Sequence, residues 1–171
     1  MLAAEALDLT GALVDDITLF GRRVSIIAHV DEQAHEHRRE AGFQPVIDRT
    51  SVAMWEWPEV KAPPSAVSVA AVVTSSSRWQ PALSTVSGFG AFGSTVLVLP
   101  RDTPPPASCI ELAERYGVWV VLASSSGVTV NHRGRTGPVP TARPTTVTKW
   151  TNEVVYARLI KDGLLEGSPA R

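Results

Sequence analysis

The sequence predicts an α/β protein in which a mixed central β-sheet is flanked by helices. Short apolar runs typical of buried strands alternate with segments whose apolar residues recur at helical spacing. Clusters of proline, glycine and serine separate these elements. The chain has 171 residues, of which 44% are hydrophobic and 19% charged, so a single domain with a real core is expected.

Residues 1–42 are expected to form a helical segment that packs on this core. One helical face is indicated by apolar residues three or four positions apart: Leu9, Leu13, Ile17 and Phe20. Residues 22–43 begin with an apolar turn and then become almost wholly polar. They are interpreted as one bent helix or a helix pair, with a strand at 24–30 as the alternative.

The α/β core is expected over residues 43–133. Alternation in "SVAMWEW" (51–57) predicts a strand, and Pro63-Pro64 predicts a turn. The uncharged run "AVSVAAVVTSS" (66–76) predicts a second strand that leads into a helix. Further elements follow in order: a buried strand at 94–100, a helix ending at Gly117, and two strands joined by a short turn at 118–133.

The C-terminal part is expected to contain a connector and one helix. Residues 134–146 are rich in proline and predict an extended connector. A helix over residues 147–166 is indicated by an apolar stripe that should dock on the sheet: Val147, Trp150, Val154, Ala157, Ile160 and Leu164.

Charge and cysteine content exclude several classes of protein. A formal net charge of −1 gives no global field toward nucleic acid or an anionic membrane, so such binding requires a local patch. Cys109 is the single cysteine, which rules out an intramolecular disulfide and fits a cytoplasmic location. No apolar run approaches the roughly 18 residues that a membrane span needs, so no membrane partner is expected.

Two motifs resemble ligand sites but have simpler interpretations. "GFGAFG" (88–93) has the glycine spacing of a dinucleotide site, yet it follows a helix and precedes a strand, the reverse of that context. Residues 29–40 concentrate possible metal ligands: His29, Asp31, Glu32, His35, Glu36, His37 and Glu40. A helix face there offers two ligands where a stable site needs three or four, so a solvated face without metal is favoured.

The order of elements over residues 43–130 resembles the core of the PD-(D/E)XK, or restriction-endonuclease-like, nucleases. In that family an Asp on the second strand and an acid-x-Lys on the third hold a divalent metal and activate water. "IDRTSVAMWEW" is similar to the second strand, with Asp48 near the metal-binding Asp. "VAAVVTSSSRW" is similar to the third strand entering its helix.

This chain departs from the family at the catalytic positions. Ala71 stands in place of the acid and Val73 in place of the lysine, and neither can ligate metal or carry a proton. The resemblance therefore implies a non-catalytic binding protein without a cofactor, acting on DNA or within a DNA-handling protein assembly. The alternative is an Mg²⁺-dependent nuclease that uses the only literal acid-x-Lys, Glu59 and Lys61, with Asp48 and possibly Glu56.

Two groups of residues are candidates for contacting a partner. Residues 131–149 contain a basic strip without acids, Arg133, Arg135, Arg143 and Lys149, which predicts phosphate contacts or a merely soluble loop. Trp55 and Trp57 share one face of the expected strand, which suits either the core or a protein partner. A protein–protein adaptor or homo-oligomer is therefore a third hypothesis.

Overall fold

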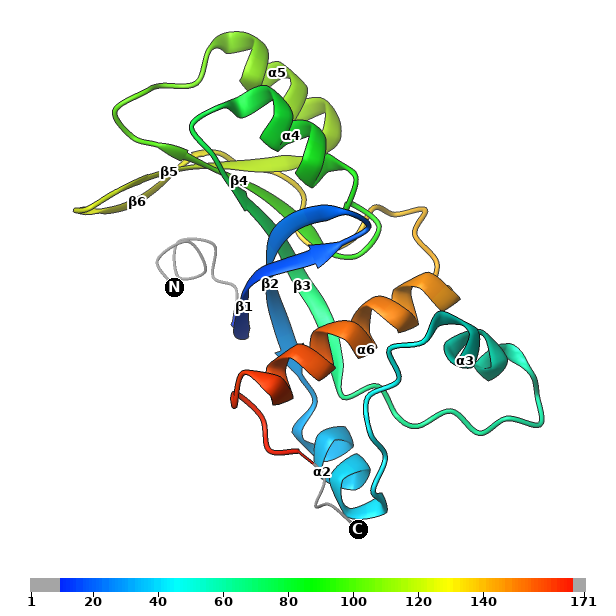
Figure 1. Ribbon diagram of the computed structural model, residues 1–171. Helices are drawn as coiled ribbons and strands as arrows, with labels where there is room; N and C mark the ends of the chain where they lie inside the picture. The colour runs from blue at the N-terminus through cyan, green and yellow to red at the C-terminus, as the bar shows by residue number, and fades with distance from the viewer. Residues whose placement is uncertain (1–9, 168–171) are drawn as a thin grey trace. The chain divides into compact units, whose positions relative to one another are not determined.

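The computed structural model describes residues 10–167 of the chain. They form an α/β structure with a mixed six-stranded sheet, ordered β1-β2-β3-β4-β5-β6, and five α-helices (Figure 1). The strands are β1 (Ala12–Leu19), β2 (Arg22–Val30), β3 (Val67–Ser75), β4 (Ser94–Pro100), β5 (Val118–Ser124) and β6 (Gly127–His132). The helices are α2 (Glu32–Ala41), α3 (Arg49–Ala53), α4 (Trp79–Ser87), α5 (Ala107–Tyr116) and α6 (Thr146–Lys161), with a 3-10 turn η1 (Met54–Glu56). The predicted fold class, an α/β protein with a mixed sheet, is confirmed.

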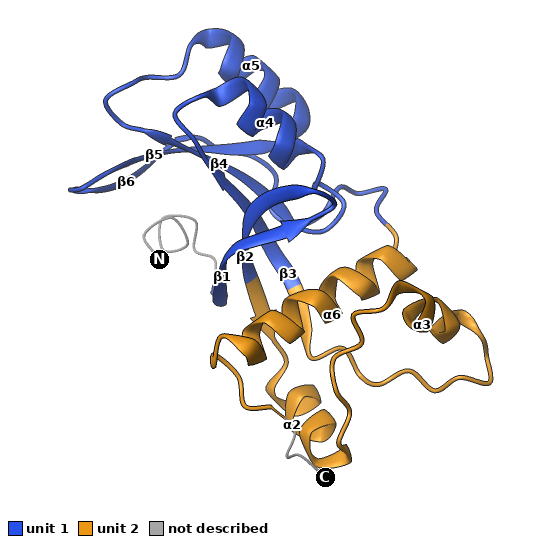
Figure 2. Ribbon diagram, in the orientation of Figure 1, with its two compact units in different colours: residues 1–27, 69–142 blue, residues 28–68, 143–171 orange. Residues whose placement is uncertain are grey.

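The chain divides into two compact units, which Figure 2 colours separately. The first unit holds residues 1–27 and 69–142, and the second holds residues 28–68 and 143–171. The boundaries pass through β2 and β3, so each unit contains part of both strands. None of the described helices is long and apolar enough to cross a membrane.

In the first unit, β3, β4 and β5 run parallel, and β6 returns antiparallel to β5. Parallel neighbours need a crossover connection, and α4 and α5 supply the two crossovers. α4 packs against β4 and α5 against β5. Apolar side chains from successive strands meet in one buried cluster: Ile27, Ala71, Val96 and Val121.

Most predictions from residue 66 onward are confirmed. The run 66–76 forms β3, and the later strands and α5 lie where their periods indicated. Gly117 ends α5 with φ of 69°, the left-handed conformation that glycine adopts without strain. "GFGAFG" connects α4 to β4 without helix or strand. The last helix ends at Lys161 rather than at 166, because Gly163 adopts a left-handed φ of 72° just after the C-cap residue Asp162.

The expected helical segment over residues 1–42 is wrong for most of its described part. Residues 12–30 form the strands β1 and β2, which a two-residue turn connects, and only α2 is helical. The strand that was the alternative at 24–30 is confirmed as part of β2.

The spacing that suggested a helix arises because buried and exposed residues do not alternate strictly along β1. Its buried side chains are Val14, Ile17 and Leu19. Two exposed residues, Asp15 and Asp16, stand between the first two of these, which is the pattern of a β-bulge. The bulge creates a three-residue spacing like that of a helix. From the expected helix face, Leu13 and Phe20 are exposed, and Leu9 lies outside the described residues.

The predicted strand at 51–57 is also wrong, because this segment forms α3 and η1. The Asp48 side chain accepts a hydrogen bond from the amide of Ser51, so a helix begins where the alternation suggested a strand. Within α3 and η1, Val52 is the buried residue. Seven residues of alternating polarity are too few to distinguish the two-residue period of a strand from the 3.6-residue period of a helix.

The second unit is organised around a buried ion pair between α2 and α6. The guanidinium of Arg38 donates two hydrogen bonds to the carboxylate of Glu153, at 2.5 Å from Nη1 and 2.9 Å from Nη2. The two side chains are 0% and 4% exposed. A buried charge is tolerated only when it is paired and hydrogen-bonded, so each of these residues requires the other.

Backbone groups and an aromatic ring complete the surroundings of this pair. Arg38 Nη2 also donates to the carbonyl of Gln44, and Glu153 Oε2 accepts from the amide of Val46 at 2.8 Å. The Tyr156 ring lies 4.7 Å from the guanidinium carbon, and its hydroxyl is 3.0 Å from Nδ1 of His35. Burial raises the pKa of the Tyr156 hydroxyl, so it stays a neutral hydrogen-bonding group.

Replacing one partner of the ion pair is expected to destabilise the protein strongly. Arg38→Met or Glu153→Leu leaves an unpaired buried charge, which costs about 3–5 kcal/mol. The double variant removes both charges but leaves the Val46 amide and the Gln44 carbonyl without these partners. Urea unfolding of the four proteins should show that it recovers part of the loss and not all of it. Strictly additive losses would contradict the coupling.

Candidate functional site

The positions that the nuclease resemblance assigns to catalysis carry hydrocarbon side chains in β3. Ala71 is fully buried in the cluster shared with β4 and β5. Val73 is half-buried and packs against the same cluster. Neither side chain offers an oxygen ligand or an ammonium group at this strand.

The carboxylate of Asp48 is engaged in hydrogen bonds within its own helix start. Its Oδ2 accepts hydrogen bonds from the amide of Ser51 at 2.7 Å and from the Ser51 hydroxyl at 2.8 Å. These bonds stabilise the ionised form, so the pKa of Asp48 is lowered. The residue therefore begins α3 as a helix cap.

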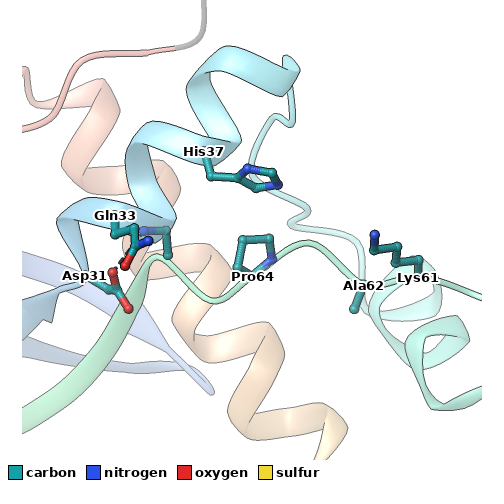
Figure 3. A pocket seen from close by; sticks show the side chains of 7 residues that line it. Asp31, Gln33, His37, Lys61, Ala62 and Pro64 are labelled. Atoms are coloured by element: carbon teal, nitrogen blue, oxygen red, sulfur yellow. Dashed lines mark hydrogen bonds between the residues drawn. The ribbon is translucent and has the colours of Figure 1, made fainter.

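Glu59 and Lys61 lie in the segment between η1 and β3, and both are exposed. Lys61 lines a pocket of about 530 Å³ together with Asp31 and His37 (Figure 3). Glu59 and Asp48 are not among the residues that line it. Among residues 10–167, no group of three or more His, Cys, Asp or Glu side chains is arranged to hold a metal ion.

The histidine-rich and acid-rich segment at 29–40 divides between a buried and an exposed face. Asp31 caps α2 by accepting from the amide of Ala34 at 2.9 Å. His35 and Arg38 face the interior of the second unit, whereas His37 and Glu36 are exposed. The segment was expected to be a solvated face, but Arg38 is buried in the ion pair with Glu153, and His35 is buried against the hydroxyl of Tyr156.

The residues of the basic strip differ in their surroundings. Lys149 forms an ion pair with Glu56 at 2.8 Å, which lowers the pKa of that carboxyl. Arg135 is half-buried, and its backbone bonds to Gly117 and to the indole of Trp119. Arg133 is exposed in the first unit, and Arg143 is exposed in the second.

The two tryptophans of the candidate protein surface differ in exposure. Trp57 is 62% exposed, and Trp55 is half-buried. Because the segment is helical rather than a strand, they do not share a sheet face. Their role in binding a partner stays a prediction.

A pocket that the sequence did not predict lies at the carboxyl end of β3. We call it the arginine pocket; it measures about 470 Å³ and is lined by Gly21, Arg22, Arg23, Thr74, Ser75, Ser76, Arg78, Pro81, Ala82 and Thr85. The hairpin of β1 and β2, the end of β3 and the start of α4 all contribute to it. In α/β sheets, ligands commonly bind beyond the carboxyl ends of parallel strands.

Several hydrogen-bond donors of the arginine pocket have no partner among the residues that the structure describes. Arg22 Nη1 donates to the carbonyl of Ser84 at 2.7 Å, and its other N–H groups have no partner within residues 10–167. The Arg78 side chain has none in that range either. α4 begins without a side-chain cap, so the positive end of its dipole is available. The buried Oγ1 of Thr74 has no hydrogen-bond partner.

A second pocket, of about 310 Å³, adjoins the first and shares Arg23, Thr74 and Ser75 with it. Asp15 and Asp16 line this pocket, and Val73 is also part of its wall. Asp16 is ion-paired with Arg23, which raises the pKa of that guanidinium. Within residues 10–167, Arg22 and Arg78 are therefore the arginines of this pocket that form no ion pair with a carboxylate.

The local sequence contained a partial signal for this site. "TSSSR" follows an apolar strand and precedes a helix, which is the position of many anion-binding turns. Serines before a helix also suit helix capping, so this signal alone does not identify an anion site. Arg22 and Arg23 could not be added because their segment was expected to be helical.

Comparison of the chain with protein-family models, with curated proteins and with solved structures finds no match.

Asp16 is expected to tolerate glycine better than a β-branched residue. Its φ of 51° is left-handed, a conformation that glycine adopts freely and valine resists. Both replacements remove the exposed pair with Arg23, so that loss cancels in the comparison. Urea unfolding should show Asp16→Val less stable than Asp16→Gly by about 1 kcal/mol or more. Equal stability would argue against the bulge.

Proposed function

We propose that this protein binds the backbone of DNA without cleaving it, as a degenerate relative of the PD-(D/E)XK nucleases. The observation that carries the proposal is the arginine pocket at the carboxyl end of β3. The resemblance suggests DNA, and the pocket offers donors suited to a phosphate group.

The chemistry of the arginine pocket suits the oxygens of a phosphate group. Guanidinium groups bind phosphate oxygens through paired N–H donors, and Arg22 and Arg78 retain such donors. α4 begins without a side-chain cap, and Arg78, the residue at its N-cap position, lines the pocket. The hydroxyls of Ser75 and Ser76 can donate to the remaining oxygens.

The absence of catalysis in this proposal follows from β3 itself. In the family that the chain resembles, the metal ligand and the lysine project from the third strand. Here Ala71 is packed in the core, and Val73 stands beside the two carboxylates of the neighbouring pocket. Without these catalytic groups, the site is expected to bind a phosphate and not to hydrolyse it. The exposed Arg133 and Arg143 are additional candidate contacts.

Binding of short labelled DNA, followed by fluorescence anisotropy across a series of salt concentrations, tests the proposal. The variant Arg22→Gln/Arg78→Gln should weaken binding at least ten-fold at low salt. It should also reduce the slope of log K against log salt by about 1.4 to 1.8, the value for two lost phosphate contacts. The matched control is Arg101→Gln/Arg115→Gln, which removes the same charge from exposed positions of the first unit.

Equal weakening in the control would mean that binding depends on net charge and not on the pocket. Absence of binding at low salt would contradict the proposal altogether. Cleavage of the DNA in Mg²⁺ that is lost in Lys61→Ala would favour the nuclease alternative, with Asp48 and Glu59 as partners of Lys61.

A second candidate function, protein interaction, is favoured by apolar side chains exposed in the second unit. Ile47 is 63% exposed, Met54 48% and Trp57 62%. Large apolar groups of this kind often mark surfaces that bind protein. If they mediate self-association, sedimentation across a concentration series should show an oligomer that Trp57→Ser weakens. A monomer at every concentration would exclude the homo-oligomer.

A further inference from the structure

We infer that the DNA bound at the arginine pocket is single-stranded and that one of its bases stacks on Phe20. This inference rests on the proposed function and adds the class of nucleic acid and a second point of contact. It is argued from the β1–β2 hairpin, which brings an aromatic ring to the edge of the pocket.

Phe20 occupies an unusual position for a large apolar residue. It lies in the two-residue turn of the hairpin, it is 42% exposed, and its φ is 52°. A bulky residue in the left-handed region is strained, and glycine or asparagine normally stands there. Strain of this kind collects at functional sites, where a side chain must be held in one place.

Packing holds the exposed ring in place. Its centroid lies 6.0 Å from that of Phe89 and 5.6 Å from that of Phe92, within the range of favourable aromatic pairs. Phe89 is buried, and Phe92 is half-buried. The three rings form a cluster, and Phe20 is still 42% exposed within it.

The ring is next to the arginine pocket along the chain. Gly21 and Arg22 follow Phe20 directly and both line the pocket. Consecutive Cα atoms are about 3.8 Å apart, so the backbone of Phe20 lies within roughly 8 Å of that of Arg22. Arg22 is held by its bond to Ser84. A fixed aromatic surface and a fixed cation are therefore close enough to contact the base and the phosphate of neighbouring nucleotides.

This combination is suited to single strands. Proteins that bind them pair a positive groove with aromatic rings on which bases stack, regardless of sequence. In a duplex the faces of internal bases are covered by their neighbours, so Phe20 has no base to contact. The arginine pocket alone would bind either form.

Anisotropy with a single-stranded DNA, its duplex and an abasic strand of the same length tests the inference. The wild-type protein should bind the single strand more tightly than the duplex or the abasic strand. Phe20→Leu keeps an apolar side chain against Phe89 and Phe92 but removes the stacking surface. It should weaken binding of the single strand about ten-fold, the loss expected for one base–aromatic contact, and leave binding of the abasic strand unchanged.

Phe43→Leu is the matched control, because Phe43 is 44% exposed in the second unit. It should leave all three affinities unchanged, and urea unfolding should show that both variants are folded. If Phe20→Leu has no effect on the single strand, or lowers all three affinities equally, the stacking inference is wrong. The proposed function then still stands, provided that Arg22→Gln/Arg78→Gln weakens binding. If none of the three DNAs binds, both are wrong.

Discussion

The constraint on which the candidate site depends is the burial of β3. From Val69 to Val73 none of its side chains is exposed, and β4 runs parallel beside it. The covered part of such a strand accepts hydrocarbon side chains. The polar side chains of β3 lie outside this stretch, at Ser68 before it and at Thr74 and Ser75 after it, and α4 begins shortly after Ser75. The arginine pocket is thus placed by the core that the strand must fill.

The two units are stabilised by different means. In the first, apolar side chains of successive parallel strands form the core, and the β1–β2 hairpin carries Asp16 and Phe20. These are the two non-glycine residues with positive φ in the described part of the chain, and they lie next to the two pockets. The second unit depends on the pair of Arg38 and Glu153, which lie 115 positions apart in sequence. Its interior accepts charge because each group is paired.

The sequence was informative where a segment kept the hydrophobic spacing of a strand, or that of a helix, over enough residues to exclude the alternative. β3, β4 and α5 were predicted for this reason, and the mixed sheet followed from their order. The bulge at Asp15 and Asp16 defeated the same reasoning, because one inserted residue turned a strand period into a helical one. The ion pair could not be predicted, because no local sequence pattern connects Arg38 with Glu153. The arginine pocket was missed because two of its arginines come from that misassigned hairpin.

The central claim is that a phosphate of DNA binds where β3 ends and α4 begins. Titrating the isotopically labelled protein with short single-stranded DNA, and following its backbone amides by NMR, tests this most directly. The account predicts that the largest shifts occur at residues 74–80 and at Gly21 and Arg22. Shifts confined to residues 131–149, or to the second unit, would contradict it.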